Sequence, residues 1–381
     1  MTTVAERKSS MLIKNAKAFI NGEFHENTDI VISEGKVAAI GQGLMVEGSE
    51  TIDLKGDLLL PGFVDVHIHA FMGQDTMNGE EAVRHMSREL KKFGVAAFLP
   101  TTMSASPEDT QAALKGIKAV MDRPEPDGAI VLGAHMEAPF LQESKAGAQL
   151  KQYFALPDEK NWAAYAGPYA SIVRMITMAP EKEGALDFIR RLTDSGITVS
   201  LGHTSADAET VHAAADHGAT HVTHTFNAQT PLNHRAPGVP GAALVDDRLN
   251  CEVISDGIHL HPDVVRLLMR CKGKEHTVAI TDAMEAAGMP DGKYQLGGQD
   301  VFVKEGAARL ADGTLAGSTL TMIRAFQNLI RFGASPEDAA LMTTRTPARS
   351  IQNEEVGEIE LGAPAIFARF DKDYQFIGTI G

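Results

Sequence analysis

The sequence predicts an α/β protein: a (β/α)8 TIM barrel joined to a small β-sandwich that both ends of the chain build. Between residues 63 and 281, eight short apolar runs alternate with amphipathic helical patterns, and this alternation is typical of such a barrel. The 381 residues leave room for roughly 250 residues of barrel and one smaller unit. The segments on either side of the barrel contain strand-like runs. We therefore expect residues 1–57 and 351–381 to form the small unit and residues 58–350 the barrel.

Residues 11–57 and the last 25 residues read as β structure. Asn21-Gly22 is a strong hairpin signal, because both residues tolerate the positive φ angles of a tight turn. We expect strands over residues 11–20, 29–33, 36–40 and 51–54 at the start of the chain, and over residues 357–361, 365–370 and 374–380 at its end.

The middle of the chain contains the eight βα repeats. Two connections differ from the rest: residues 138–170 form a long loop that we expect to cap the site, and residues 291–315 look like a β-rich insertion. The predicted strands cover residues 63–69, 95–101, 129–135, 172–177, 197–201, 221–224, 251–255 and 277–281; the predicted helices cover residues 79–93, 107–121, 184–195, 207–217, 262–271, 318–333 and 336–344.

Composition and charge limit the functional classes. A formal net charge of −15 argues against non-specific binding to nucleic acid or to anionic membranes. No apolar run approaches the roughly 20 residues of a membrane span, and the polar residues 1–10 carry no secretory signal. Only two cysteines are present, Cys251 and Cys271, which favours a reducing compartment. These features predict a cytoplasmic protein without nucleic-acid or membrane partners.

Residues able to bind a metal stand at or just after the ends of six predicted strands. A barrel places its active site at the carboxyl ends of the strands, so these side chains are expected to converge. Fourteen histidines could place one there by chance, but several at separate strand ends are a much stronger signal. The residues are His67, His69, Glu137, His203, His224, Asp256, His259 and Asp282.

Imidazole and carboxylate groups together predict metal-assisted hydrolysis. His203 and His224 offer nitrogen, and Glu137 offers oxygen that can also bridge two ions. His67 and His69 can hold the second ion. The donor set suits Zn, Fe, Mn and Co, and one or two ions per subunit fit it, with Zn the first expectation.

Asp282 is the expected general base and acid. Its place after the eighth strand allows it to take a proton from water and return it to a leaving group. A carboxylate that faces a cation has a lowered pKa, so its basicity must come from its position.

With these motifs in hand, the sequence resembles the amidohydrolase superfamily, and within it the branch that deacetylates phosphorylated amino sugars. The resemblance covers about residues 11–370. It rests on Pro61-Gly62-Phe63-Val64-Asp65-Val66-His67-Ile68-His69, His135-Met136-Glu137-Ala138-Pro139-Phe140, Gly202-His203-Thr204, His224-Thr225-Phe226-Asn227-Ala228, Pro231-Leu232-Asn233-His234-Arg235-Ala236-Pro237-Gly238, Ser255-Asp256-Gly257-Ile258-His259, Thr281-Asp282-Ala283 and Leu315-Ala316-Gly317-Ser318.

The resemblance implies a division of roles. Glu137, His203 and His224 become ligands of the main metal, and Asp282 becomes the catalytic acid and base. It implies a phosphorylated N-acetyl amino sugar as substrate, N-acetyl-D-glucosamine 6-phosphate first, and a homodimer with a neighbouring subunit near the phosphate. The implied substrate contacts are Ala148, Gln149, Asn227, Ala228, Arg235, Asp256, Gly257, His259, Leu315, Ala316 and Gly317.

The chain also departs from the pattern of this branch. Ala138 stands where a glycine is usual, and Gln149 stands where a histidine is expected near the substrate. Three functions therefore remain open: the deacetylase, another amidohydrolase acting on a different N-acyl amino-sugar phosphate or on a cyclic amide, and a non-catalytic protein that binds metal or sugar phosphate. The predicted fourth strand has no lysine to bridge two metals, which counts against a cyclic-amide hydrolase.

Overall fold

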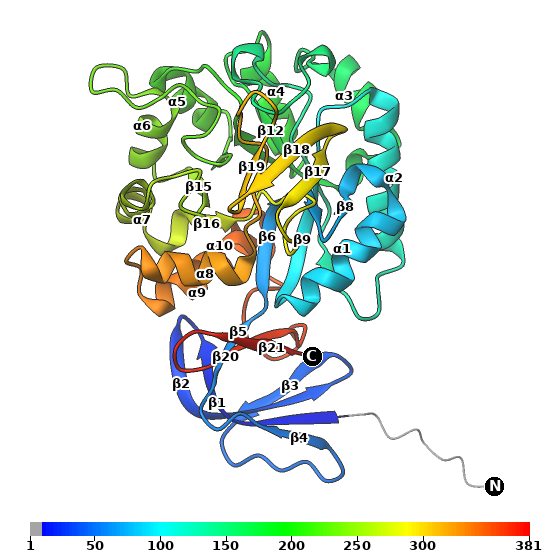
Figure 1. The fold of residues 1–381 in the computed structure, drawn as a ribbon, viewed down its shortest axis with the longest axis vertical. Coiled ribbons are helices and arrows are strands. Elements are labelled where there is room, and N and C mark those ends of the chain that lie inside the picture. Colours follow the sequence, from blue (N-terminus) through cyan, green and yellow to red (C-terminus); the bar gives the residue numbers. More distant parts are fainter. Residues whose placement is uncertain (1–9) are drawn as a thin grey trace, which may run out of the picture.

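Eight parallel strands form the barrel that the sequence predicts (Figure 1). This computed structural model describes residues 10–381, so the first nine residues of the predicted small unit lie outside the described part. The strands follow one another in chain order, and the first and last meet where the Asp282 N–H donates to the His67 carbonyl at 2.9 Å. They are β6 (Phe63–Ile68), β9 (Val95–Thr102), β11 (Ala134–Met136), β12 (Val173–Met178), β13 (Thr198–Leu201), β14 (His221–Val222), β15 (Asn250–Ile254) and β16 (Thr277–Ile280).

Helices cover the outside of the barrel and confirm most of the predicted ones. Ser106 and Ser335 cap two of them, each accepting a hydrogen bond from the N–H three residues on, with proline in the first turn. Three helices lie outside the predicted set: α3, α6 and α10. The helices are α1 (Glu80–Lys92), α2 (Pro107–Asp122), α3 (Glu159–Tyr165), α4 (Ala185–Asp194), α5 (Ala208–Asp216), α6 (Gly238–Val245), α7 (Pro262–His276), α8 (Met322–Arg331), α9 (Pro336–Thr343) and α10 (Arg345–Ser350).

The third predicted strand, residues 129–135, is interrupted in the structure. It divides into β10 (Ile130–Val131), which pairs only with β9, and β11, which belongs to the barrel. Gly133 lies between them with φ 148°, a conformation that a residue with a side chain rarely adopts. The break therefore follows from the glycine.

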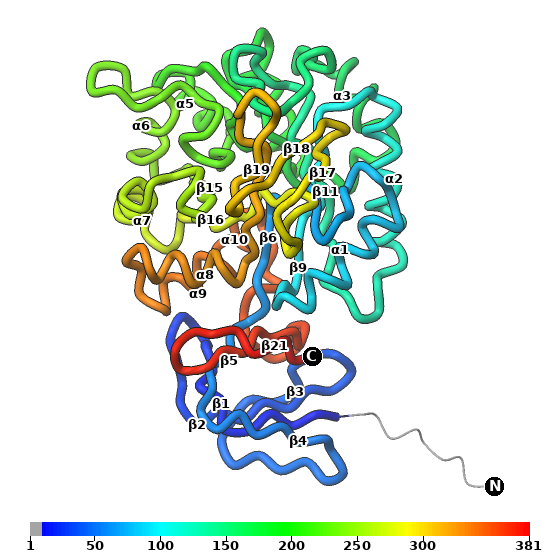
Figure 2. The backbone as a smooth tube through the Cα atoms, in the orientation of Figure 1, coloured from blue at the N-terminus to red at the C-terminus, as the bar shows by residue number. Residues whose placement is uncertain are grey.

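Both ends of the chain build one seven-stranded sheet, in which the blue and red segments lie side by side below the barrel (Figure 2). Its order is β21-β20-β5-β1-β2-β3, and β4 pairs with β1. A single sheet, rather than two separate ones, surrounds the apolar core of this unit. The strands are β1 (Ser10–Ile20), β2 (Glu23–Ser33), β3 (Lys36–Gly41), β4 (Glu50–Asp53), β5 (Leu58–Pro61), β20 (Phe367–Phe370) and β21 (Phe376–Ile380).

β5 connects the two units and begins at residue 58, where we expect the boundary. Leu58–Pro61 pairs with β1 and β20 and so belongs to the terminal sheet. Successive side chains of a strand point to opposite faces. Leu59 accordingly lies in the core of the terminal sheet, while Leu58 and Leu60 lie in the core of the barrel.

The predicted strand over residues 357–361 is absent from the structure, which has turns and bends there. Gly357 has φ 90°, and a Cβ atom on it would lie 2.8 Å from the Thr344 carbonyl oxygen. The chain therefore passes too close to the backbone after α9 for an ordinary strand residue at this point.

Two loop segments cover the mouth of the barrel. The insertion after β16 forms an antiparallel sheet of β17 (Gly292–Leu296), β18 (Gln299–Lys304) and β19 (Ala307–Arg309), as its composition predicts. It has its own apolar core, which includes Met103 and Ala316. The connection after β11 contains α3, and Gln299 Nε2 donates to the Ala148 carbonyl at 2.6 Å, joining the two segments. Strands β7 (Ala70–Phe71) and β8 (Gln74–Asp75) form a short hairpin after β6.

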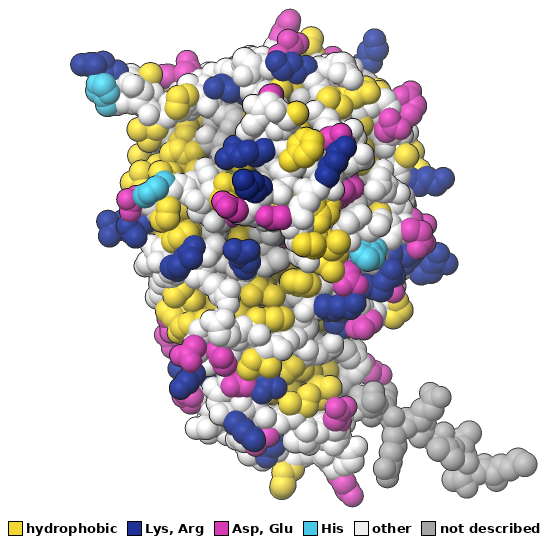
Figure 3. All heavy atoms as spheres, in the orientation of Figure 1, with side chains coloured by type: hydrophobic (Ala, Val, Ile, Leu, Met, Phe, Trp, Pro, Cys, Tyr) yellow, Lys and Arg dark blue, Asp and Glu magenta, His cyan; other side chains and the backbone are white. Residues whose placement is uncertain are grey.

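The surface has both signs of charge. On the face shown in Figure 3, Lys and Arg side chains are interspersed with Asp and Glu, and no large basic patch is visible. Among residues 10–381, no helix has the length and apolar character needed to cross a membrane.

Candidate active site

Six predicted side chains converge at the carboxyl ends of the barrel strands. They form two groups of three. Within each group, one possible ligand atom of each residue lies within 4.8 Å of the other two, and all six residues are buried. We call them the His67 triad (His67, His69 and Asp282) and the Glu137 triad (Glu137, His203 and His224).

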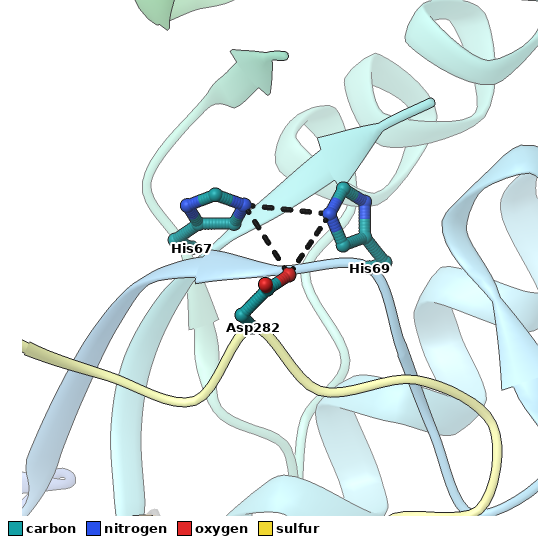
Figure 4. A group of neighbouring side chains, drawn as sticks. All are labelled: His67, His69 and Asp282. Atoms are coloured by element: carbon teal, nitrogen blue, oxygen red, sulfur yellow. Dashed lines mark hydrogen bonds and ion pairs between the residues drawn. The ribbon is translucent and has the colours of Figure 1, made fainter. Parts of the chain in front are cut away.

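The His67 triad joins the first strand to the last. His67 lies in β6 and His69 just beyond its end, and both rings point toward Asp282 on the loop after β16 (Figure 4). The His67 and His69 Nε2 atoms are 3.3 Å apart, and they lie 3.5 and 3.2 Å from Asp282 Oδ1. Three donor atoms thus surround one point, as a metal site requires.

The Glu137 triad comes from the ends of β11, β13 and β14. Glu137 Oε1 lies 3.1 Å from His203 Nε2 and 3.0 Å from His224 Nε2. The second oxygen, Glu137 Oε2, lies 3.0 Å from His69 Nε2. Glu137 therefore contacts both triads and is placed to bridge two ions.

The hydrogen bonds of the four histidines show that the site fits a cation. Each Nδ1 faces an oxygen: Glu252 Oε2 for His67, and the backbone carbonyls of Thr101, Lys145 and Asn227 for His69, His203 and His224. A ring that donates through Nδ1 presents an unprotonated Nε2 when it is neutral. The Nε2 lone pairs then face one another; those of His203 and His224, for example, are 3.2 Å apart. Facing lone pairs repel, and a cation bound by both nitrogens removes that repulsion.

Charge within the site also favours a cation. Burial alone would raise the pKa of the Glu137 and Asp282 carboxyl groups, but the facing histidines outweigh it and hold both pKa values below the usual range. The same carboxylates raise the pKa of His69 to about 9, against the effect of burial. Both carboxylates therefore stay ionised at neutral pH, and the raised pKa of His69 shows that the site stabilises a positive charge there.

Three of the six residues have a left-handed backbone. The φ angles of His203, His224 and Asp282 are 46°, 28° and 48°. Non-glycine residues rarely adopt such angles, and strain of this kind is concentrated at functional sites. In each case the strand has just ended, so the positive φ turns the side chain over the barrel mouth.

A pocket of about 300 Å³ opens above the two triads. Seven of the predicted substrate contacts line it: Ala148, Gln149, Asn227, Ala228, His259, Leu315 and Gly317.

The remaining predicted contacts do not line the pocket. Asp256 instead holds His259, accepting from its Nδ1 at 2.7 Å, and Gly257 lies in the turn between them. Ala316 is buried in the core of the insertion. Arg235 lies on an exposed loop, where its Nη1 is 2.8 Å from His234 Nε2, so the chain does not bring it to its own pocket.

Gln149, at the position where a histidine was expected, contacts a metal-site residue. Its Nε2 donates to Glu137 Oε2 at 2.6 Å, and its Oε1 accepts from the Ser104 N–H at 2.8 Å. Both ends of the amide are thus fixed, with the side chain buried at the pocket wall. The glutamine therefore orients the carboxylate that both triads share.

Among the site residues that were missed in the sequence, two are of a charged type. Glu252 of β15 is buried beneath the triads, and the signal for it was an acid between the apolar residues Cys251 and Val253. Lys145 lines the pocket and is the only lysine or arginine among its lining residues. Lys145 carries no motif of its own, so nothing in the sequence indicated its place.

Comparisons with known proteins agree with this geometry. The model of the amidohydrolase family matches residues 58–379. The chain belongs to the amidohydrolase family. With the two ligand triads, membership of this amidohydrolase family supports a divalent metal cofactor.

Three similar proteins extend the comparison within the amidohydrolases. The N-acetylglucosamine-6-phosphate deacetylase of Lysinibacillus sphaericus is 36% identical, over 93% of this chain and 92% of its own. The N-acetylgalactosamine-6-phosphate deacetylase of Escherichia coli O157:H7 is 38% identical, over 89% of each chain. The solved structure of a Mycobacterium smegmatis N-acetyl-D-glucosamine-6-phosphate deacetylase mutant, in complex with N-acetyl-D-glucosamine 6-phosphate, has a TM-score of 0.90 at 30% identity and covers 98% of both chains.

Proposed function

We propose that this amidohydrolase hydrolyses the acetamide of N-acetyl-D-glucosamine 6-phosphate to D-glucosamine 6-phosphate and acetate, in amino-sugar catabolism. The observation that carries the proposal is the convergence of the Glu137 triad and Asp282 at the base of one pocket. Relatives 36% identical over most of the chain carry the name of this activity.

In the reaction, Asp282 moves the proton. A divalent ion held by the triads supplies a Lewis acid for the amide carbonyl and lowers the pKa of water. The lowered pKa of Asp282 keeps it ionised, so it accepts the proton of the attacking water. It then returns that proton to the amine nitrogen as the carbon–nitrogen bond breaks. Glu137, oriented by Gln149, holds the base of the pocket in place.

We propose Zn as the metal, with one ion at the Glu137 triad and a second at the His67 triad. Imidazole nitrogen with carboxylate oxygen suits Zn, and Fe, Mn and Co share that preference. Metal analysis of the purified protein, by inductively coupled plasma mass spectrometry, gives both identity and number.

The phosphate is expected at the outer end of the pocket, near Asn227, Ala228 and His259. Arg235 offers the planar fork that matches phosphate, but it lies on an exposed loop away from its own pocket. We therefore propose a homodimer in which Arg235 of each subunit serves the other subunit's pocket. We also propose a cytoplasmic location, and two structural units with β5 assigned to the terminal one.

N-acetylgalactosamine 6-phosphate is a second candidate substrate. A relative 38% identical over 89% of the chain is named for that sugar. In addition, Gln149 stands in the pocket wall where a histidine is expected near the substrate. A cyclic amide is a weaker candidate, because β12 has no lysine to bridge two metals and Glu137 occupies the bridging position.

Acetate release tests these alternatives together. The purified protein is offered both sugar phosphates and a cyclic amide, before and after chelation and after metal is restored. Turnover of N-acetyl-D-glucosamine 6-phosphate that follows the metal supports the proposal. If only N-acetylgalactosamine 6-phosphate or only the cyclic amide is hydrolysed, that compound is the substrate instead. If the protein binds metal but hydrolyses none of the three compounds, it is a binding protein and not an enzyme.

A further inference from the structure

Glu252 is a fully buried carboxylate that the proposed reaction does not use. It lies in β15 beneath the triads, with none of its side chain exposed. Its Oε2 accepts two hydrogen bonds, one from His67 Nδ1 at 3.0 Å and one from the backbone N–H of His224 at 3.0 Å. One oxygen thus contacts a member of each triad.

This contact fixes the ring of His67. Glu252 Oε2 accepts from the His224 N–H and has no proton to donate, so it acts as an acceptor toward His67 as well. The His67 proton therefore stays on Nδ1. The opposite nitrogen, Nε2, then offers its lone pair to the point that it shares with His69 and Asp282. A carboxylate behind a ligating imidazole both orients the ring and makes its free nitrogen more basic.

His67 differs from the other three histidines in this respect. The Nδ1 atoms of His69, His203 and His224 face backbone carbonyls, whereas His67 Nδ1 faces a side chain. The other oxygen of Glu252, Oε1, is buried without a hydrogen-bond partner among the described residues. Burying a carboxylate with one oxygen unsatisfied is unfavourable, and such a group in a folded protein calls for a functional reason.

We propose that Glu252 is a positioning residue for the second metal ion: it holds His67 in the orientation that the His67 triad needs. The inference rests on the proposed metal-dependent function and adds the residue that makes this barrel a two-ion site. The first ion depends less on Glu252, because the His203 and His224 rings are held by backbone carbonyls.

The test is metal stoichiometry. Wild type, Glu252→Ala and Glu252→Gln are stripped by chelation and equilibrated with buffered zinc, and bound ions per chain are measured by mass spectrometry. Asp65→Asn is the matched control, because Asp65 is also buried and accepts from the backbone N–H of His67 rather than from its ring. We expect the second ion to bind about 10 to 100-fold more weakly in Glu252→Ala, and less weakened in Glu252→Gln, which can still accept. Asp65→Asn should bind two ions.

The outcomes separate the inference from the function. Unchanged affinity for both ions in a folded Glu252→Ala protein overturns the inference, and so does wild type that holds a single ion at saturating zinc. If Glu252→Ala does not fold, the same comparison is made with Glu252→Gln, and unchanged affinity there overturns the inference. Wild type that binds no ion overturns the metal-dependent function itself.

Discussion

The two ligand triads meet at Glu137 but are supported in different ways. In the Glu137 triad, both histidines donate to backbone carbonyls, those of Lys145 and Asn227. In the His67 triad, His67 depends on the side chain of Glu252. A substitution leaves a backbone carbonyl in place as an acceptor, whereas substitution of Glu252 removes the acceptor of His67. We therefore expect the proposed second ion site to be the part that a single change at Glu252 weakens most.

The strongest test of this comparison removes one histidine from each triad. His203→Ala should lower kcat/KM about 10⁴-fold, because loss of the main metal removes several kcal/mol of transition-state stabilisation. His67→Ala should lower it only about 10 to 100-fold and release one ion. Steady-state rates and metal content measured on the same samples check both values. Equal losses in the two variants would contradict the distinction between the triads.

Asp282→Asn tests the proton transfer that we assign to Asp282. We expect kcat to fall ~10²–10⁴-fold with KM little changed, since the amide cannot accept the proton of the attacking water. Binding of the sugar phosphate to this variant, measured by calorimetry, should persist. Activity near that of wild type would refute the role of Asp282 as base and acid.

Arg235→Ala tests the opposite end of the pocket, where neither triad acts. KM for the phosphorylated sugar should rise about 10 to 100-fold with kcat unchanged, the usual effect of losing a hydrogen bond to a charged group. Arg190→Ala, at another exposed arginine, is the control. An unchanged KM would remove Arg235 from the substrate site. Size-exclusion chromatography with light scattering would show whether the wild type is a dimer.

The last test concerns stability rather than activity, in the scaffold under both triads. Burial lowers the pKa of His221 to about 4 from 6.5, so the folded protein keeps this ring neutral while the unfolded chain gains a proton. The free energy of unfolding is therefore unaffected by His221 above about pH 6.5. It falls by roughly 3 kcal/mol as the pH is lowered from there toward 4. Urea unfolding of metal-free wild type and His221→Asn at pH 7 and pH 5 should show a steeper loss in wild type; parallel losses would exclude His221 as the cause.

Much of the barrel and its six convergent side chains could be predicted, because each feature leaves a local trace. Alternating apolar runs indicate the strands and helices, and a histidine or acid just after such a run indicates the mouth of the barrel. His203, His224 and Asp282 were found in this way. The pairing of His67 with His69 also followed, since they are two residues apart on one strand, whereas the place of Asp282 beside them did not.

The missed features depend on contacts between distant segments. Glu252 has meaning only because β15 brings it beneath His67, which is 185 positions away. The bond between Gln149 and Glu137 depends on the path of a long loop, and the distance of Arg235 from its own pocket depends on another loop. Gly357 ends a predicted strand because of the backbone after α9. No local pattern carries such information.

The pairing of β5 with β20 has a consequence for the order in which the protein is made. The strand that leads into the barrel is hydrogen-bonded to one that is synthesised more than 300 residues later. During translation, the eight barrel strands emerge while β5 still lacks this neighbour, so the terminal sheet is completed last. A chain that ends before residue 367 leaves this edge of β5 unpaired, and an unpaired strand edge is a template for pairing with another chain.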